Sequence, residues 1–219
     1  MSRGVSHLIG DEIVARLREY FPIRWSQPTN GFGSLIRTIL SQNTNFRNED
    51  SAYKTLDKRI GVSPEALASA SIDDVMDSIR SAGLYRNKAP RIVELARIVL
   101  EKYCGDLSSL LKKNYDEAKE ELMTLPSVGM KTADVFLLFQ GNKAVIPIDT
   151  HIFRISRRLG FAPKTSNHDE VRRALEAVFR PEDYRDIHLL LIQLGREVCT
   201  ARKAKCIICP LADICPKLI

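Results

Sequence analysis

The stretch that decides the fold is residues 125–133, Leu-Pro-Ser-Val-Gly-Met-Lys-Thr-Ala, which predicts a tight turn between two helices. Pro126 cannot continue the helix before it, and Gly129 is expected to provide the positive φ that a tight turn needs. The residues after this glycine begin an apolar helical segment. Backbone amides at such a helix start can bind a phosphate oxygen without reading a base. The stretch therefore predicts a two-helix hairpin over about residues 115–140 that can contact a phosphate backbone.

Two ionisable side chains in and after this hairpin are candidates for chemistry. Lys131 lies in the first turn of the second helix. The helix dipole disfavours a cation there and favours the neutral amine that a nucleophile needs. Asp149 follows Pro147 at an expected helix start, where it can be an N-cap or a carboxylate that acts on an amine or a substrate. An ordinary surface charge is the alternative interpretation of Lys131.

The spacing of apolar residues predicts an all-α protein. Apolar side chains recur at helical spacing in several segments, and no alternating run of useful length indicates a strand. Ser63 and Ser71 have the residue type and context that begin a helix. Residues 144–148 are apolar, but their proline makes them a connector. The expected helices include 11–20, 35–40, 88–103, 171–178 and 187–198.

Four of the five cysteines lie together near the end of the chain, with the spacing C-x6-C-x2-C-x5-C. Thiolates at this spacing can bind one tetrahedral ion such as zinc, or one iron–sulfur cluster. Four unrelated buried cysteines are the remaining alternative. A metal would also hold the charged loop between the first two cysteines rigidly toward phosphates. The four are Cys199, Cys206, Cys209 and Cys215; the fifth, Cys104, is expected to be a buried or partly buried thiol.

The composition is that of an ordinary globular protein with a moderate excess of basic residues. The 219 residues are 44% apolar and 27% charged, and 33 Lys and Arg against 27 Asp and Glu give a net charge of +6. This balance favours polyanionic partners. No segment reaches the roughly 18 uninterrupted apolar residues of a membrane span, and no secretory signal is evident. We therefore expect a cytoplasmic protein that does not contact a membrane.

Three features in this order resemble the helix-hairpin-helix/Gly-Pro-Asp DNA glycosylases: the hairpin with Gly129, then Pro147 and Asp149, then the cysteine tail. Within this superfamily the chain is most similar to the endonuclease III-like members, over about residues 31–215. The resemblance implies two helical domains with a DNA-binding cleft between them. The expected domains are a helical barrel at 23–144 and a discontinuous iron–sulfur domain at 1–22 plus 145–219.

The resemblance also implies an activity and a partner. Members flip a damaged nucleotide out of duplex DNA and excise its base. Lys131 matches the lysine of the bifunctional enzymes, whose amine forms a Schiff base at C1′ before β-elimination cuts the strand. Asp149 matches the essential aspartate, which activates the nucleophile and stabilises positive charge on the sugar. The implied partner is double-stranded DNA with a damaged base or an abasic site, and the expected substrates are oxidised pyrimidines such as thymine glycol. With this partner we expect a monomer that is associated with the nucleoid in a prokaryote.

The same resemblance assigns the cofactor and the DNA contacts. The four cysteines match the ligands of a [4Fe–4S] cluster. Gln42 would fill the gap left by the flipped base, and Leu84 would wedge into the opposite strand. Some of the arginines at 154, 157 and 158 are expected to add phosphate contacts. Further expected DNA contacts are Ser127, Val128, Gly129, Arg202, Lys203 and Lys205.

Two departures from the family pattern bear on base preference, and two other functions stay open. Ser127 stands where the common hairpin has its first glycine, and Asn45-Phe46 stands where bacterial relatives have an acidic residue. One alternative is a mismatch uracil or thymine glycosylase of the same fold, although such relatives often have tyrosine at the position of Lys131. The other is a non-catalytic DNA-binding protein that uses the hairpin for phosphates and a metal for stability.

Overall fold

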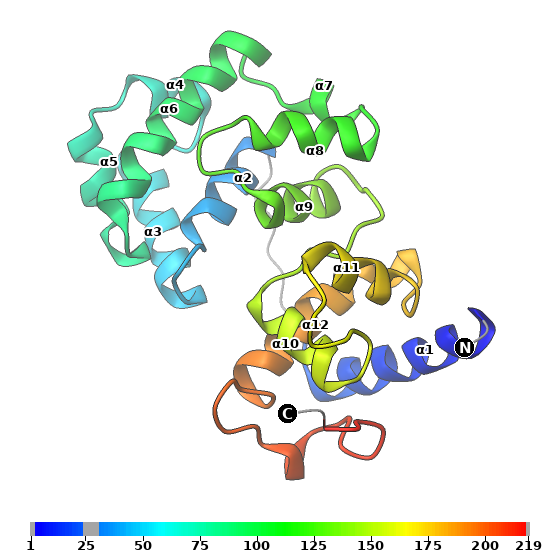
Figure 1. Ribbon diagram of the computed structural model, residues 1–219. Helices are drawn as coiled ribbons and strands as arrows, with labels where there is room; N and C mark the ends of the chain where they lie inside the picture. Colours follow the sequence, from blue (N-terminus) through cyan, green and yellow to red (C-terminus); the bar gives the residue numbers. More distant parts are fainter. Residues whose placement is uncertain (1–2, 24–30, 218–219) are drawn as a thin grey trace. The chain divides into compact units, whose positions relative to one another are not determined.

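The computed structural model describes residues 3–23 and 31–217, with the side chains of α1 from His7 onward, and every regular element in these ranges is helical (Figure 1). The all-α prediction is therefore confirmed. None of the helices in the described ranges is both long and apolar enough to cross a membrane. The α-helices are α1 (Arg3–Tyr20), α2 (Gly31–Leu40), α3 (Phe46–Arg59), α4 (Pro64–Ser69), α5 (Ile72–Ser78), α6 (Tyr85–Tyr103), α7 (Ser108–Leu111), α8 (Tyr115–Met123), α9 (Met130–Phe139), α10 (Thr150–Arg158), α11 (His168–Glu176) and α12 (Tyr184–Glu197). Short 3-10 helices are η1 (Arg80–Ala82), η2 (Pro181–Asp183) and η3 (Cys206–Ile208).

Five of the described α-helices begin at a serine or asparagine N-cap, a signal that can be read in the sequence. In α3, α4, α5, α8 and α11, a serine or asparagine side chain accepts a hydrogen bond from an amide of the first turn. Such a cap stabilises a helix by about 1 kcal/mol. The expected starts at Ser63 and Ser71 are confirmed. The helices expected at 11–20 and 88–103 begin earlier, at Arg3 and Tyr85.

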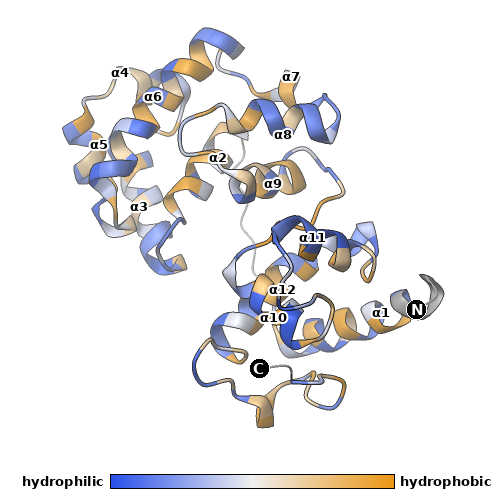
Figure 2. Cartoon of the chain, in the orientation of Figure 1, coloured by the Kyte–Doolittle hydropathy of each residue, from blue (hydrophilic) through white to orange (hydrophobic). Residues whose placement is uncertain are grey.

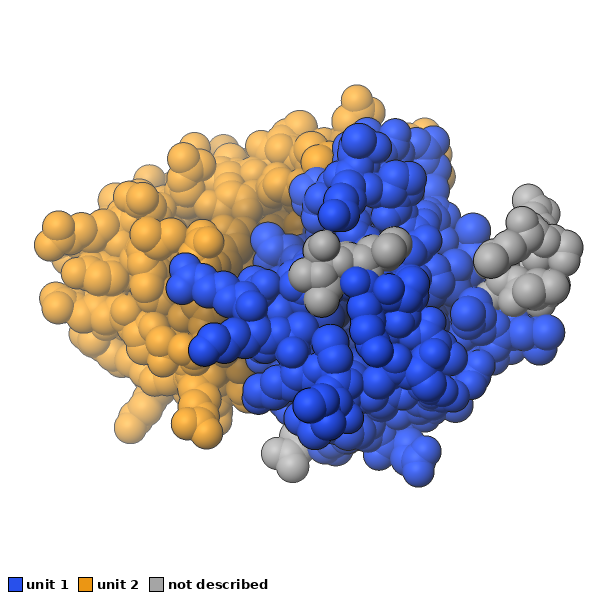
Figure 3. Space-filling model, turned by 60° about the horizontal axis from the view of Figure 1, so that its bottom comes forward, with its two compact units in different colours: residues 1–25, 144–219 blue, residues 26–143 orange. Residues whose placement is uncertain are grey.

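The chain divides into two compact units, coloured separately in Figure 3. We call Ser26–Lys143 the hairpin unit, and Met1–Trp25 with Ala144–Ile219 the cysteine unit. The cysteine unit is thus discontinuous in sequence, because the whole hairpin unit is inserted after α1.

The core of the hairpin unit is built around α6 and α9. α6 packs against α4 and α5, while α9 packs against α2 and α8. All residues from Thr132 to Phe139 are buried, and most of α9 is coloured as hydrophobic in Figure 2. A helix that is apolar on all sides belongs in the interior, and each large side chain buried there contributes about 1.5–3 kcal/mol. Burial of these eight consecutive residues therefore fixes the position of α9 and of its first turn within the unit.

The cysteine unit is held together by α12, against which α1 and α10 pack. Gly195 of α12 makes the contact with α10 close, because a Cβ atom at this position would lie 2.6 Å from the His151 Cβ. That distance is shorter than any van der Waals contact, so a larger residue at 195 would push the helices apart. α10, which begins directly after Asp149, therefore has a fixed position on α12.

Candidate active site and cysteine pocket

The predicted hairpin is present as α8, a turn and α9, but its strained residue is not the glycine. Gly129 has φ −93° and ψ 179°, which is extended backbone, whereas Ser127 has φ 64°. The expectation that Gly129 supplies the positive φ is wrong because this residue is the N-cap of α9, a position that is normally extended. Within the turn, the Val128 amide donates to the Leu125 carbonyl at 3.1 Å. The Val128 amide, expected at a phosphate, is thus used inside the turn.

Lys131 is the second residue of α9 and is half-buried. The helix begins without a side-chain cap, because its N-cap residue is Gly129. A Cβ atom at Gly129 would have no neighbour within 4 Å, so the space in front of this helix start is open. First-turn amides have no acceptor within their own helix, and the dipole favours negative charge there. The start of α9 can therefore receive an anion from outside.

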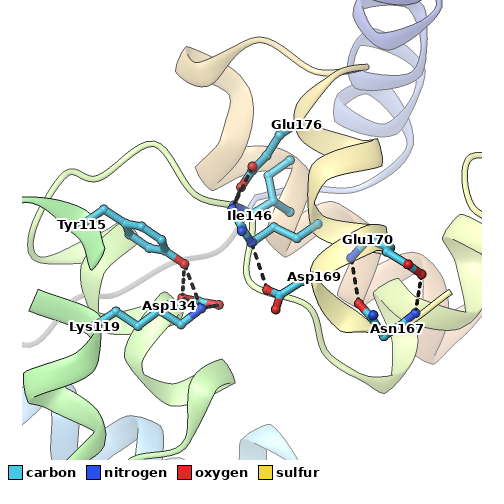
Figure 4. A network of polar contacts seen from close by, with 9 residues as sticks. Tyr115, Lys119, Asp134, Ile146, Asn167, Asp169, Glu170 and Glu176 are labelled. Carbon is cyan, nitrogen blue, oxygen red and sulfur yellow. Dashed lines mark hydrogen bonds and ion pairs between the residues drawn. The ribbon is translucent and has the colours of Figure 1, made fainter. Parts of the chain in front are cut away.

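A buried polar contact fixes α9 against α8 (Figure 4). Asp134 of α9 points toward α8, where the Tyr115 hydroxyl donates to Oδ1 at 2.8 Å and the Lys119 ammonium lies 3.0 Å from the same oxygen. Asp134 is buried and Lys119 is half-buried, so the pair is largely shielded from water and loss of either partner should destabilise the hairpin. This contact holds the two helices, and thereby the turn between them, in one register.

Asp149 is the N-cap of α10, which confirms one of the two roles considered for it. Its Oδ1 accepts a hydrogen bond from the Ile152 amide at 2.8 Å. A carboxylate has a second oxygen and further lone pairs, so capping is compatible with a catalytic role. The preceding connector is fixed as well: His188 Nδ1 lies 3.0 Å from the Pro147 carbonyl oxygen, and the Ile146 amide donates to Glu176 (Figure 4). The carboxylate therefore has a fixed direction within the cysteine unit.

The two residues expected to enter the DNA duplex both lie on loops of the hairpin unit. Leu84 is 52% exposed and has a left-handed backbone with φ 49°. Gln42 is half-buried, and its Nε2 donates to the Ser127 carbonyl at 3.0 Å and to the Thr132 hydroxyl at 3.1 Å. In this structure the Gln42 amide is thus bound to the hairpin. Asn45 and Phe46 depart from the family pattern; Asn45 is the N-cap of α3, and Phe46 is exposed.

The four clustered cysteines line one pocket of the cysteine unit. Cys199 follows α12, Cys206 begins η3, Cys209 follows η3 as its C-cap, and Cys215 lies beyond; all four are half-buried. Burial raises the pKa of the Cys209 thiol, and the three other cysteines raise it further, as expected for thiols gathered at one place. Among the described residues no set of His, Cys, Asp or Glu forms a group suited to a single metal ion.

The arginines after Asp149 are used inside the cysteine unit. Arg154 donates to the Cys199 and Gly195 carbonyls, at 2.9 and 3.0 Å. Arg158 donates to the Cys199 sulfur at 3.3 Å and to the Thr200 carbonyl at 2.8 Å. Arg157 lies over the Phe153 ring, 4.2 Å from its centroid, and donates to the Ser166 carbonyl. These guanidinium groups support the cysteine loop and α10, a use that the sequence interpretation did not foresee.

The loop cations and the fifth cysteine are at the surface. Arg202, Lys203 and Lys205 are exposed on a loop closed by two bonds, from the Thr200 hydroxyl to the Lys203 carbonyl and from the Lys205 amide to the Val198 carbonyl. Cys104 is exposed, so the expectation of a buried thiol is wrong. It is the C-cap of α6, with a left-handed backbone of φ 51°, and therefore lies beyond the last turn of the helix.

Sequence reasoning missed one buried cation in the hairpin unit, Lys88. Its side chain is only 4% exposed and donates to three backbone carbonyls. A signal for it was present, because Lys88 precedes Ile92 by four residues and Ala96 by eight, which places it on the apolar face of α6. A lysine at an apolar position of a helical stripe predicts a buried amine with fixed partners.

Comparisons with known proteins identify the family that shares the helices, the hairpin and the cysteine pocket of this chain. A family model described as HhH-GPD superfamily base excision DNA repair protein matches residues 36–181. The chain belongs to this superfamily. Endonuclease III of Thermotoga maritima is 36% identical over 205 residues, which are 94% of this chain and 91% of that protein. Endonuclease III of Escherichia coli K12 is 34% identical over 209 residues, or 93% of each chain.

Solved structures agree with this assignment. A trapped Endonuclease III–DNA covalent intermediate matches with a TM-score of 0.82 and 30% identity, over 97% of this chain and 96% of the other. A thermostable thymine-DNA glycosylase matches with a TM-score of 0.79 and 20% identity, over 97% and 96%. At that identity the second likeness shows a shared fold alone. The predicted recognition as an endonuclease III-like member of the superfamily is confirmed.

Proposed function

We propose that Lys131 is the nucleophile and Asp149 the catalytic carboxylate of this chain, which is a base-excision DNA glycosylase with AP lyase activity. The observation that carries the assignment is the place of Lys131 in the first turn of α9, a helix that begins without a side-chain cap. The helix dipole there favours the neutral amine over the ammonium. The match to an Endonuclease III trapped covalently on DNA supports a covalent route.

The proposed reaction begins with attack of the neutral Lys131 Nζ on C1′ of the damaged nucleotide. The C1′–N bond breaks, its electron pair leaves with the base, and the base takes up a proton while the amine gives one up. Opening of the sugar ring at O4′, which is then protonated, forms the Schiff base between Nζ and C1′. Loss of a C2′ proton expels the 3′-phosphate by β-elimination, and water then hydrolyses the Schiff base to restore the lysine.

Asp149 supplies a fixed negative charge for this reaction. Its N-cap bond to the Ile152 amide holds the carboxylate in one direction before substrate arrives. A preorganised carboxylate can accept the proton that the amine loses and stabilise the positive charge that develops on the sugar. Electrostatic groups of this kind contribute about 10²–10³-fold in rate.

The substrate is duplex DNA with a damaged base or an abasic site, and oxidised pyrimidines are the first choice for the base. Leu84 is an exposed apolar side chain on a loop, as a wedge between bases requires. Gln42 would leave its hairpin partners to fill the gap of the flipped nucleotide. The start of α9 at Gly129 and the turn residue Ser127 would lie on the phosphate backbone, with Arg202, Lys203 and Lys205 as further backbone contacts. Val128 is buried and its amide is bonded within the turn, so it is left out of these contacts.

The four cysteines would hold a [4Fe–4S] cluster. All four line one pocket, and N–H donors already point at two of the sulfurs: Arg158 to Cys199 at 3.3 Å, and the Lys217 amide to Cys215 at 3.4 Å. Such donors stabilise thiolate ligands. When bound, the cluster supplies a rigid cross-link that positions the exposed loop cations.

The activity is tested by borohydride trapping on a duplex panel: thymine glycol, 5-hydroxycytosine, uracil or thymine opposite guanine, and an abasic site. We expect a covalent adduct with the oxidised pyrimidines and the abasic site. Lys131→Ala should lose the adduct and strand cleavage while its duplex affinity stays within about tenfold. Unchanged cleavage by Lys131→Ala would remove this lysine from the mechanism. Trapping only with mispaired uracil or thymine would place the chain in the mismatch branch.

The cofactor is tested by the purified protein alone. An iron–sulfur cluster makes the protein brown, with visible absorption, and about four irons and four sulfides per chain are expected. A colourless protein with one zinc per chain would contradict the cluster. Removal of the metal should unfold the loop that contains Cys206 and Cys209, because η3 is a short element whose Ile207 and Ile208 are exposed.

A further inference from the structure

Lys88 is a buried cation with no place in the chemistry proposed above. Its Nζ donates to the carbonyl oxygens of Leu40, Gln42 and Ala82, at 2.8, 2.7 and 3.0 Å. An ammonium has three N–H donors, so these three bonds use all of them. The side chain lies among the apolar residues of α6 and is 4% exposed.

The three carbonyls belong to two segments that are distant in sequence. Leu40 ends α2 and Gln42 follows it, where the last carbonyls of a helix have no partner within the helix. Ala82 ends η1, directly before Gly83 and Leu84. Lys88 therefore connects the end of α2 to the end of η1. Both segments continue into exposed loops with a left-handed residue, Asn43 with φ 55° and Leu84 with φ 49°.

Gln42 extends this connection to the hairpin. While its carbonyl accepts from Lys88, its side chain donates to the Ser127 carbonyl at 3.0 Å and the Thr132 hydroxyl at 3.1 Å. Thr132 is the neighbour of Lys131 in α9. A continuous chain of hydrogen bonds thus runs from Ala82 through Lys88 and Gln42 to the turn before the proposed nucleophile, and all of it lies within the hairpin unit.

The positive charge at this buried position destabilises the folded state. Burial lowers the pKa of the Lys88 ammonium to about 8, although three carbonyl acceptors favour the charged form. The side chain is also one turn from the start of α6, where the dipole disfavours a cation. A methionine would fill nearly the same volume without a charge, and replacing buried charges with apolar groups is often stabilising. An apolar residue, however, could not bind the three carbonyl groups and keep them at fixed distances from one another.

We propose that Lys88 is a positioning residue that sets the distances between the loop of Gln42, the loop of Leu84 and the hairpin turn. Gln42 can then fill the gap of the flipped nucleotide, and Leu84 can enter the duplex, while Lys131 is placed to react. The inference rests on the proposed function and adds a residue to it that touches no DNA. Loss of the ammonium should separate the loops from one another while the chemistry at Lys131 is retained. The defect should therefore appear where DNA must be unstacked.

The test compares wild type with Lys88→Met on duplexes with a tetrahydrofuran abasic analogue opposite 2-aminopurine, whose fluorescence rises when it is unstacked. Wild type should raise the signal on binding, and Lys88→Met should lose most of the rise, as should the reference variant Leu84→Ala. Borohydride trapping is then compared on duplex and single-stranded abasic DNA. The ratio of duplex to single-stranded trapping should fall about tenfold in Lys88→Met, because only the duplex requires the wedge.

A readout without DNA checks the cause. Amide hydrogen exchange should rise in Lys88→Met at both 41–45 and 82–87, because one group holds both segments. Fluorescence, trapping ratio and exchange equal to wild type would overturn the proposal. If Lys88→Met does not fold, Lys88→Gln, which keeps two donors, takes its place. The changes in fluorescence, trapping ratio and hydrogen exchange should then have the same direction and be smaller. Absence of trapping by wild type on any abasic DNA would instead refute the proposed function.

Discussion

The starts of α9 and α10 carry the two proposed catalytic residues and are built in opposite ways. α9 begins at Gly129, which has no side chain to cap the first-turn amides, and Lys131 follows two residues later. α10 begins at Asp149, whose own carboxylate accepts the Ile152 amide. One start is open to an anion from outside, and the other contains its anion already.

The difference shows how one kind of local structure can serve two tasks. A helix without a good N-cap residue is about 0.5–2 kcal/mol less stable than a capped one, and with glycine at this position the loss is only a few tenths. In return, the first-turn amides of the uncapped helix can bind a ligand. A capped start gains that stability and also fixes the direction of a carboxylate. The hairpin unit therefore offers a place for a phosphate beside an amine, and the cysteine unit offers a fixed negative charge. Variants can separate capping from chemistry at each start.

Among changes to the N-cap residues themselves, the largest expected effect is at Asp149. Asp149→Asn should lower base excision about a hundredfold or more, because the negative charge is lost, while asparagine caps a helix as well as aspartate does. The free energy of unfolding should therefore stay close to that of wild type. Excision kinetics on the duplex that wild type prefers, with urea unfolding of both proteins, measure the two effects.

Asp149→Ala is the matched control, because it removes the cap together with the charge. It should be about as inactive as Asp149→Asn and about 1 kcal/mol less stable. Equal stability losses in both variants would mean that the Ile152 contact is not a cap, and full activity of Asp149→Asn would mean that the carboxylate has no catalytic role.

A smaller effect is expected when the open start is closed. Gly129→Asp places a carboxylate where a phosphate would bind, and the extended backbone at this position accepts any residue. Duplex affinity should fall about tenfold, while the stability of the protein is unchanged or slightly higher. Gly129→Ala adds a Cβ without an acceptor and serves as the control for binding measured by fluorescence anisotropy. Equal affinity of the two variants would show that no phosphate lies at this helix start.

The start of α6 gives a third case, in which a cation is buried close to a helix N-terminus. The folded-state pKa of Lys88 is about 8 against 10.5 for an ordinary lysine, so between these values the unfolded chain binds more protons than the folded one. Stability from this group therefore rises with pH across the window from about 8 to 10.5 and is lost as pH falls through 8. Wild type should gain stability relative to Lys88→Met over this window in urea titrations. A constant difference would mean that Lys88 has an ordinary pKa.

The smallest effect is expected in the turn before α9. Ser127 has φ 64°, which a residue with a Cβ atom adopts at a cost of about 1–2 kcal/mol. Ser127→Gly should raise the free energy of unfolding by about 0.5–1 kcal/mol, because glycine removes that strain but makes the unfolded chain more flexible. Gly129→Ser, two residues later, should stabilise by only a few tenths, since its backbone is already extended. Thermal or urea unfolding compares them, and a loss of stability in Ser127→Gly would contradict the assigned strain.

The sequence predicted the helices and the hairpin better than it predicted the turn. Periodicity and caps suffice for helices such as α12 and α4, because the signal lies within the segment itself. The φ of Ser127 could not be read from residue types, because glycine at 129 has the stronger preference for positive φ but is the N-cap of α9, where the backbone is extended. Partners distant in sequence, such as those of Lys88 and Arg154, also require the fold. Lys131 and Asp149 as a catalytic pair stay a prediction.

The most direct test of the central claim is to locate the covalent bond itself. Wild-type protein is trapped with borohydride on abasic duplex DNA, digested, and the cross-linked peptide is sequenced by mass spectrometry. The account predicts that the sugar remnant is attached to Lys131, in the peptide that begins α9. Attachment to another lysine or to the N-terminal amine would contradict it, because the amine at the uncapped helix start would then not be the nucleophile.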